Sequence, residues 1–473
     1  NLLQRMDTLN NDNPLSHVLL GGQTVLLEDI AEVRPELLAL LVINNARGRL
    51  LLGPWYVPVD ESLVSGESLI RNLLTARADT RQHGINLLNV AYLPDGAAHA
   101  AQLPQIVRGF GMDAVFMRYS GPVAHLPFRW QAPDGSSVLA MSHDFPDGQS
   151  DLDEQKAVEP DGPLLWMQSV TDNTAPPSGD GLPSTQSALS DYIKALRKSL
   201  PDALRPALHG ELRLHTLRPH AYLLPGTLST RVYLKQANAR QQSQLTYVVE
   251  PLLAIALTHA KVPYPDNLRA LLGHAWRALI RNQSRNHLGG CSSDTVHEAN
   301  ESRFHEVEDT SAYVVNQALK ALHGETAVGA RHVLPLQPDT TSEAETYIVV
   351  WNPHGRALKQ VVEVELALPE GKHPAHLTAP DGDEKPFGWK RDDRRLSFLA
   401  EAPSVGYSTY TLRLSEKPTP EHLLTTTVES AFISSSFGET LAVEDEQLIW
   451  KRGDTTFPDV LRFFDGGDAV DAY

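Results

Sequence analysis

The chain has 473 residues, of which 41% are hydrophobic and 21% are charged, and its formal net charge is −17. This composition is typical of a folded protein, and the length predicts two to four domains. The acidic balance argues against a nucleic-acid partner, which favours a basic surface. The single cysteine, Cys291, excludes an internal disulfide and a cysteine zinc cluster. We expect Cys291 to be a small buried residue.

The sequence gives no sign of a membrane partner. No apolar run approaches the roughly 18 residues that a membrane span requires, and no signal peptide opens the chain. A cytoplasmic location is therefore the expectation.

Strands and helices alternate through residues 1–215. Short apolar runs predict strands over 17–20, 50–57, 86–93, 114–117 and 164–170, and a hairpin over 130–141. Helical spacing predicts helices over 25–41, 65–83, 97–110 and 190–200. Such alternation predicts a parallel sheet or a β/α barrel, in which the chemistry lies where the strands end.

The remaining residues fall into two further segments. Helical periodicity over 230–259, 267–282 and 294–323 predicts a three-helix bundle. After residue 329, period-two alternation over 347–351, 361–366, 395–399 and 407–414 predicts an antiparallel β-sandwich. Further strands are expected over 441–443 and 448–451, in a sandwich that is incomplete. The predicted domains are therefore 1–215, 216–328 and 329–473.

Two aspartates follow predicted strands and are candidate catalytic residues. Asp95 ends the 86–93 strand, and Asp172 follows the 164–170 strand. Each aspartate also has a simpler alternative role: Asp95 as a helix N-cap and Asp172 as the first residue of an Asx-turn. Together they supply the pair of carboxylates that glycoside hydrolysis requires.

Aromatic and acidic residues cluster after the 50–57 strand, where Trp55, Tyr56 and Asp60 are candidate sugar-binding residues. Aromatic rings stack on the apolar face of a sugar, and carboxylates bond to its hydroxyls. The alternative is a buried aromatic pair beside a solvated acid. No HxH or HExxH pair occurs among the 19 histidines, so the residues alone predict no histidine metal site.

Several long motifs occur along the chain: GPWYVPVDESLVSGESLIRNLL (53–74), YLPD…QLPQIVRGFG (92–111), STRVYLKQANAR (229–240), CSSDTVH (291–297) and LRFFDGGD (461–468). These motifs resemble those of the glycoside hydrolase family 38 α-mannosidases of bacteria, and the resemblance covers nearly the whole chain. It implies a seven-stranded β/α barrel, a three-helix bundle and β-sandwich domains. It also implies a retaining mannosidase that acts on α-mannosides of small oligosaccharides.

The resemblance also implies roles for particular residues. Asp95 matches the family's nucleophile and zinc ligand, and Asp172 is the best match to its general acid. Arg285 stands where the family has its fourth zinc ligand, a histidine, and the chain begins after the segment that supplies two more ligands. His287, two positions on, is expected to face elsewhere. Zinc is therefore expected of the family, but binding by this chain is not expected, because a guanidinium cannot ligate a metal.

Two functional hypotheses follow. The chain is either an α-mannosidase, or an inactive family member that serves as a carbohydrate-binding or structural subunit. In both, we expect a second polypeptide or a further C-terminal segment to complete the β domains, since exposed sheet edges seek partners.

Overall fold

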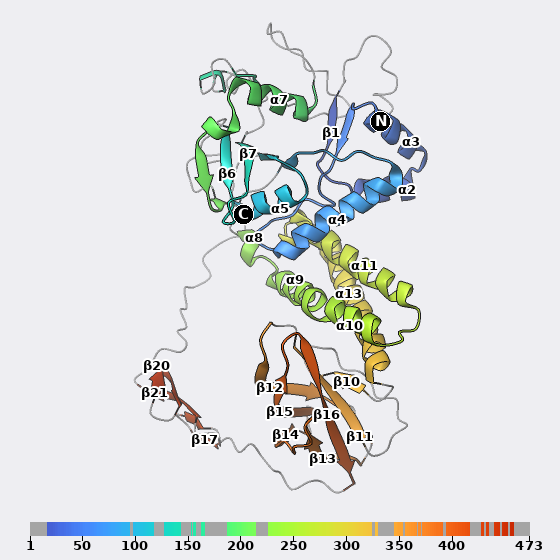
Figure 1. Cartoon of the computed structure of the whole chain (residues 1–473), viewed down its shortest axis with the longest axis vertical. Coiled ribbons are helices and arrows are strands. Elements are labelled where there is room, and N and C mark those ends of the chain that lie inside the picture. Colours follow the sequence, from blue (N-terminus) through green and yellow to red (C-terminus); the bar gives the residue numbers. More distant parts are fainter. Residues whose placement is uncertain are drawn as a thin grey trace. The chain divides into compact units, whose positions relative to one another are not determined.

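A computed structural model describes most of the chain, which combines α and β structure. The described residues are 17–94, 98–117, 127–142, 153, 155–157, 162–165, 187–213, 226–323, 327–329, 345–352, 355–366, 368–369, 371–390, 394–416, 427–429, 432–434, 439–444, 447–452 and 455–457. Figure 1 shows the elements in chain order. In the described part of the chain, no helix is both long and apolar enough to cross a membrane.

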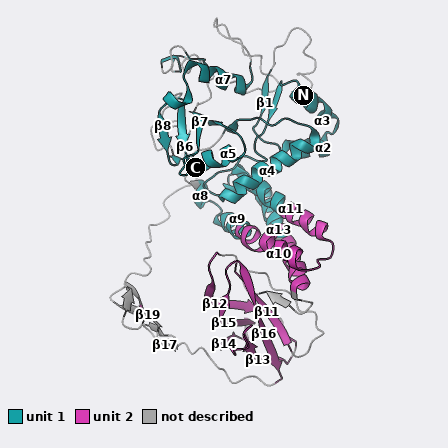
Figure 2. Ribbon diagram, viewed as in Figure 1, with its two compact units in different colours: residues 1–242, 276–306, 471–473 teal, residues 243–275, 307–470 magenta. Residues whose placement is uncertain are grey.

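The chain divides into two compact units, which are coloured separately in Figure 2. Unit 1 contains residues 1–242 and 276–306, and unit 2 contains residues 243–275 and 307–470. The division falls within three of the helices, because each of these helices has residues in both units.

Unit 1 alternates strands and helices, as its sequence pattern predicts. Its strands are β1 Val18–Leu20, β2 Leu50–Leu52, β3 Ala91–Leu93, β4 Ala98–His99, β5 Ala114–Met117, β6 Phe128–Gln131, β7 Ser137–Ser142, β8 Ala207–His209 and β9 Leu212–Arg213. The helices among them are α2 Leu26–Val33, α3 Glu36–Ala46, α4 Gly66–His83, α5 Leu103–Gly109 and α7 Leu189–Ser199, with a 3-10 turn over Asp202–Leu204.

The strands of unit 1 form one five-stranded sheet and two strand pairs. The sheet order is β3-β5-β7-β6-β8, in which only β6 and β7 pair antiparallel. Strands β1 and β2 pair in parallel, and β4 pairs with β9. Apolar side chains from β3, β5, β6, β7 and α5 fill one core, whose fully buried members include Trp130 and Phe128 of β6.

Two predicted helices of unit 1 are wrong in extent. The helix expected over 25–41 is two helices that break at Arg34-Pro35, because proline has no N–H and restricts the residue before it. The helix expected over 97–110 begins only at Leu103, since Ala98 and His99 pair with β9 as strand β4. Gly111 then ends this helix at φ +78°, as its sequence position predicts.

Further predictions in unit 1 are confirmed for helix α4 and for the β6–β7 hairpin. Helix α4 begins after the N-cap Ser65, whose hydroxyl accepts from the backbone N–H of Ser68. Strands β6 and β7 form the expected hairpin around Gly135. The strand expected over 164–170 is absent at Leu164 and Leu165, and its other residues lie outside the described part.

The helical segment agrees with its predicted periodicity. After α8 Gly226–Ser229, one continuous helical stretch comprises α9 Val232–Gln244, a π-helical turn over Leu245–Val249 and α10 Glu250–His259. Helices α11 Pro265–Asn282, α12 Arg285–Leu288 and α13 Asp294–His323 follow. Within unit 1, amide side chains connect these helices: Gln241 donates to the Phe304 oxygen at 2.6 Å, and Asn282 donates to the Asn300 oxygen at 2.8 Å.

Two sheets that share one core form most of the β structure of unit 2. The first has the order β10-β11-β16-β13, and the second β12-β15-β14. Side chains from both fill the core, where Phe398 and Tyr410 meet edge to face at 4.9 Å. Their strands are β10 Ala327–Gly329, β11 Glu345–Asn352, β12 Leu358–Glu365, β13 His373–Thr378, β14 Phe387–Lys390, β15 Arg395–Ala402 and β16 Gly406–Ser415.

A third sheet lies later in the chain. Its order is β17-β18-β19-β20-β21, and all its neighbouring strands are antiparallel. The strands are β17 Thr427–Glu429, β18 Phe432–Ser434, β19 Glu439–Glu444, β20 Gln447–Arg452 and β21 Thr455–Phe457. The strands predicted over 441–443 and 448–451 are therefore confirmed.

Candidate functional site

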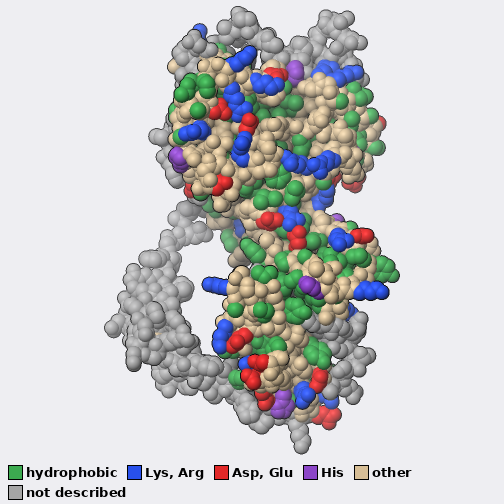
Figure 3. Space-filling model, viewed as in Figure 1, with side chains coloured by type: hydrophobic (Ala, Val, Ile, Leu, Met, Phe, Trp, Pro, Cys, Tyr) green, Lys and Arg blue, Asp and Glu red, His purple; other side chains and the backbone are tan. Residues whose placement is uncertain are grey.

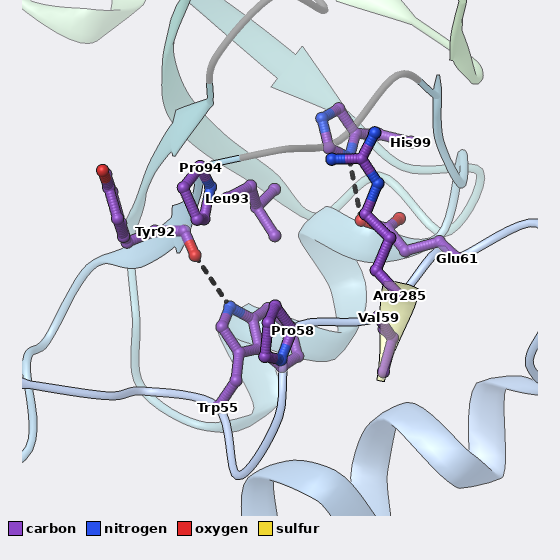
Figure 4. Close-up of a pocket in the computed structure, with 9 residues that line it drawn as sticks. All are labelled: Trp55, Pro58, Val59, Glu61, Tyr92, Leu93, Pro94, His99 and Arg285. Carbon is purple, nitrogen blue, oxygen red and sulfur yellow. Dashed lines mark hydrogen bonds and ion pairs between the residues drawn. The ribbon is translucent and has the colours of Figure 1, made fainter. Parts of the chain in front are cut away.

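The loops that follow strands β2 and β3 line a pocket in unit 1 (Figure 4). These loops leave the carboxyl ends of two strands of the β/α region, which is where α/β folds place their ligands. The empty space in and around the pocket, open solvent included, is about 360 Å³. Its described lining consists of Trp55, Pro58, Val59, Glu61, Tyr92, Leu93, Pro94, His99 and Arg285.

Trp55 connects the two loops. Its indole nitrogen donates to the backbone oxygen of Tyr92 at 3.0 Å, and its side chain is almost fully buried. Gly53 gives the chain the backbone conformation that leads to Trp55. Its φ is +82°, and a Cβ there would lie 2.4 Å from a methyl carbon of Leu87. The wall that Trp55 forms is therefore fixed by backbone geometry as well as by packing.

Glu61 and His99 form a buried pair on the opposite side of the pocket. The imidazole Nδ1 lies 2.8 Å from Glu61 Oε1, and the backbone N–H of Ala100 donates to Glu61 Oε2 at 2.8 Å. The side chains of Glu61 and His99 are 3% and 1% exposed. A buried carboxylate of this kind is stable because both of its oxygens accept hydrogen bonds.

Trp55 and Glu61 thus bind the chain on both sides of residues 95–97. Tyr92, which accepts from Trp55, precedes this segment, and His99 and Ala100, which bind Glu61, follow it. Both anchoring side chains come from the single loop after β2. The loop therefore fixes the positions of Tyr92 and of His99 with Ala100, which stand on either side of Asp95 in the sequence.

Arg285 reaches the pocket from the start of α12. Its backbone N–H donates to the Pro58 oxygen at 2.9 Å, beside an antiparallel bridge between Val59 and Ser284. Gly289 allows the tight turn that follows, since a Cβ there would meet the Arg285 oxygen at 2.6 Å. Arg285 is thus held against the same loop that carries Trp55 and Glu61.

Lys235 fastens the far side of this turn. Its ammonium donates to the backbone oxygens of Thr230 and Gly289, the latter at 3.1 Å. Burial lowers the pKa of Lys235 to about 8, against smaller opposing effects of Cys291 and Asp60. The turn that carries Arg285 is therefore hydrogen-bonded to a lysine whose burial disfavours its charged form.

Arg277 of helix α11 stabilises the other side of the loop after β2. It binds Asp79 through two hydrogen bonds of 2.6 and 3.1 Å, pairs with Glu28, and lies 5.4 Å from the centre of the Tyr56 ring. Burial would lower the pKa of Arg277, but the hydrogen bond and charge of Asp79 raise it overall. The pKa of Tyr56 is raised by its burial and by the adjacent Glu28.

The structure brings together only some of the residues singled out from the sequence. Trp55 lines the pocket, whereas Tyr56 is fully buried and donates to Glu28 instead. Asp60 accepts from the backbone and hydroxyl of Ser62 and is not part of the described lining. Asp95 and Asp172 lie outside the described residues.

Two other expectations near the turn can be compared with the structure. His287 is not part of the described lining, and its pKa is lowered by burial and by the charge of Arg303. Cys291 is not buried as expected: it is partly exposed, with its sulfur 3.7 Å from the Asn286 oxygen. Its place after the double-glycine turn keeps it out of the core.

Sequence reasoning missed Glu61 and His99 as a pair. Glu61 stands beside Asp60 in the motif, and His99 follows Asp95 by four positions, so only their nearness to candidate residues could have indicated them. Their contact joins positions 38 residues apart in the chain. Local patterns do not report such a contact.

The described lining does not fit a zinc ion. Glu61 is engaged by His99 and Ala100, and the guanidinium of Arg285 has no lone pair to donate. Of the described lining, His99 Nε2 has a lone pair without a partner, but it supplies one ligand where zinc requires three or four. Among the residues that the structure describes, no three His, Cys, Asp or Glu side chains are arranged to hold a metal.

The chain matches two family models. The N-terminal domain of glycosyl hydrolase family 38 matches residues 31–199, and the α-mannosidase middle domain matches residues 223–322. The chain belongs to glycoside hydrolase family 38. The resemblance found in the motifs is thereby confirmed.

Curated relatives agree with this assignment. A putative mannosylglycerate hydrolase of Halalkalibacterium halodurans is 28% identical over 416 residues, which cover 78% of this chain and 44% of the relative. Alpha-mannosidase 2C1 of Mus musculus is 28% identical over 330 residues, which cover 64% of this chain and 30% of the relative. The chain thus spans less than half the length of these two relatives.

A solved structure has the same fold. The crystal structure of an alpha-mannosidase from Enterococcus faecalis V583 superimposes with a TM-score of 0.70 at 22% identity, covering 97% of this chain and 58% of the other. The expectation of a mixed α/β fold of the family 38 type is therefore confirmed.

Proposed function

We propose that this chain forms the sugar-binding part of a glycoside hydrolase that acts on α-mannosides. The observation that carries the proposal is a pocket at the carboxyl ends of β2 and β3 in a member of family 38. The names of the relatives, mannosylglycerate hydrolase and alpha-mannosidase, support a mannoside as the substrate class.

The proposed reaction retains the configuration at the sugar. Asp95, directly after the lining residue Pro94, attacks the anomeric carbon as the leaving oxygen receives a proton from Asp172. Water then releases the sugar from Asp95 after giving its proton to Asp172. Family 38 is associated with zinc, but the proposed mechanism contains no metal step, because Arg285 does not fit a ligand position.

Hydrolysis of p-nitrophenyl α-mannoside by the purified chain tests this proposal. We expect turnover that Asp95→Asn reduces by several orders of magnitude, with substrate binding retained. The matched control is Asp134→Asn, at an exposed turn of the β6–β7 hairpin, which should leave turnover unchanged. Absence of turnover in the wild-type chain would reject hydrolysis.

One observation favours a second function, sugar binding without turnover. Arg285 places a permanent cation in the pocket at the position that aligns with a zinc ligand in the family. An inactive subunit would bind methyl α-mannoside in calorimetry and would hydrolyse no mannoside. Activity that requires Asp95 would reject this alternative.

The proposal extends to the architecture. We assign the strand pairs and the sheet of unit 1 to a seven-stranded β/α barrel over 1–215, the helices to a three-helix bundle over 216–328, and the remainder to β-sandwich domains over 329–473. We also propose a cytoplasmic location and a second polypeptide or further C-terminal segment that completes the β domains. Size-exclusion chromatography tests the last point, since a stable, soluble monomer would count against it.

A further inference from the structure

The Glu61–His99 pair fixes the form of the imidazole. A carboxylate can only accept hydrogen bonds, so His99 Nδ1, which lies 2.8 Å from Glu61 Oε1, carries the proton. Glu61 is itself held in place, because its other oxygen accepts from the Ala100 N–H. In the neutral imidazole, the second nitrogen, Nε2, is then an acceptor with an available lone pair.

This second nitrogen is buried and lacks a donor. Within the part of the chain that the structure describes, no group forms a hydrogen bond with His99 Nε2. Buried acceptors are normally paired, and an unpaired one costs stability. Since His99 also lines the pocket, a bound molecule is in a position to supply the missing donor.

The other lining residues indicate what kind of molecule this is. Trp55 and the prolines at positions 58 and 94 provide an apolar wall, and Figure 4 shows Glu61, His99 and Arg285 grouped on the opposite side. A sugar has an apolar face for the first surface and hydroxyl donors for the second. A hydroxyl group therefore satisfies the buried nitrogen without adding charge.

We propose that His99 Nε2 accepts a hydrogen bond from a hydroxyl of the bound α-mannoside, and that Glu61 fixes the tautomer that makes this contact possible. The inference rests on the proposed function and adds a substrate-binding residue and a positioning residue to it. His99 acts by contact with the sugar, and Glu61 acts through His99.

Two variants separate these roles. In His99→Asn the amide nitrogen replaces Nδ1 and keeps a donor for Glu61, but Nε2 is lost. We expect the affinity for methyl α-mannoside to fall about fivefold to tenfold, with little change in thermal stability. In Glu61→Gln the new amide donates to Nδ1, which moves the imidazole proton to Nε2, and a similar loss of affinity is expected.

The chain offers a matched control. His376 and Glu384 form the same contact at 2.6 Å, but their side chains are 62% and 66% exposed. His376→Asn should therefore leave the affinity unchanged. Calorimetric titration of the four proteins, the wild type included, provides the comparison.

Nitrogen-15 NMR of histidine-labelled protein gives a readout that a merely structural role would not change. The wild-type His99 signal, identified by its loss in His99→Asn, should show a protonated Nδ1 and an unprotonated Nε2, and Glu61→Gln should reverse the pattern. A wild-type Nε2 that carries a proton would overturn the proposal. So would unchanged affinity in His99→Asn. A wild-type chain that binds no α-mannoside would overturn the proposed function together with this inference.

Discussion

The indole nitrogen of Trp55 donates a hydrogen bond of 3.0 Å to the backbone oxygen of Tyr92. This bond connects the loop after β2 to the end of β3, and both groups are buried. It explains why a tryptophan stands at this position, since no other side chain offers both a large apolar surface and a single N–H donor.

Trp55→Phe tests this bond. The change keeps most of the apolar surface but leaves the Tyr92 oxygen without its donor, so we expect a loss of about 1–3 kcal/mol in the free energy of unfolding. Denaturant unfolding measures it. The control is Trp389→Phe, because the Trp389 indole nitrogen has no partner among the described residues. Equal costs for the two variants would contradict the prediction.

The Arg277–Asp79 pair should be more costly to break than to replace. Arg277→Met leaves a carboxylate that is only 7% exposed without its cation, and we expect a loss of roughly 2–4 kcal/mol, moderated because Arg277 is 36% exposed. The double variant Arg277→Met with Asp79→Leu should recover a large part of this loss.

The same helix provides the control for this prediction. Arg269 pairs with Asp266 where both side chains are well exposed, at 58% and 91%. Arg269→Met should change the unfolding free energy by less than about 0.5 kcal/mol. If the double variant is no more stable than Arg277→Met alone, the argument from the buried charge is wrong.

Gly289→Ala should disturb the turn that carries Arg285. The added Cβ would lie 2.6 Å from the Arg285 oxygen, so the backbone must shift, and a cost of about 1–3 kcal/mol is expected together with weaker mannoside binding. Gly273→Ala is the control, because a Cβ at this helical position meets nothing within 4 Å. That change should stabilise the protein by about 0.5–1 kcal/mol. Thermal unfolding distinguishes the two, and two changes of the same sign would count against this account.

The lowered pKa of Lys235 predicts how the stability of the chain depends on pH. Its pKa is about 8 in the folded chain, below its ordinary value of 10.5. Between these values the unfolded chain binds more protons than the folded chain, so the Lys235 contribution to stability rises with pH over this range and is constant below it. The stability of the wild type relative to Lys235→Met should therefore increase from pH 8 to pH 10 in urea unfolding. Lys194→Met, at a side chain that is 75% exposed, should show no such trend, and a flat Lys235 difference would refute the prediction.

Periodicity predicted the elements well where local signals dominate. Helix α4 has a capping serine at Ser65 and a terminal glycine at Gly84, and both ends agree with expectation. The failures occurred where a tertiary contact decided the outcome. Ala98 and His99 have a sequence compatible with a helix, but pairing with β9 makes them a strand.

The site was predictable only in part. Trp55 was singled out because aromatic residues after a strand suit a sugar, and Arg285 because the family resemblance implies a histidine at its position; both residues line the pocket. Glu61 and His99 were not identified as a pair, because their contact depends on how two loops meet. The roles of Asp95 and Asp172 stay predictions.

The separation between Trp55 and Glu61 has a consequence for variation in this loop. These side chains are six positions apart. Trp55 hydrogen-bonds to Tyr92, before residues 95–97, and Glu61 hydrogen-bonds to His99 and Ala100, after them. The length of the loop is therefore constrained. Inserting or deleting one residue between positions 55 and 61 would break either the Trp55 contact or the Glu61 contacts. Homologous loops should therefore vary in composition more readily than in length.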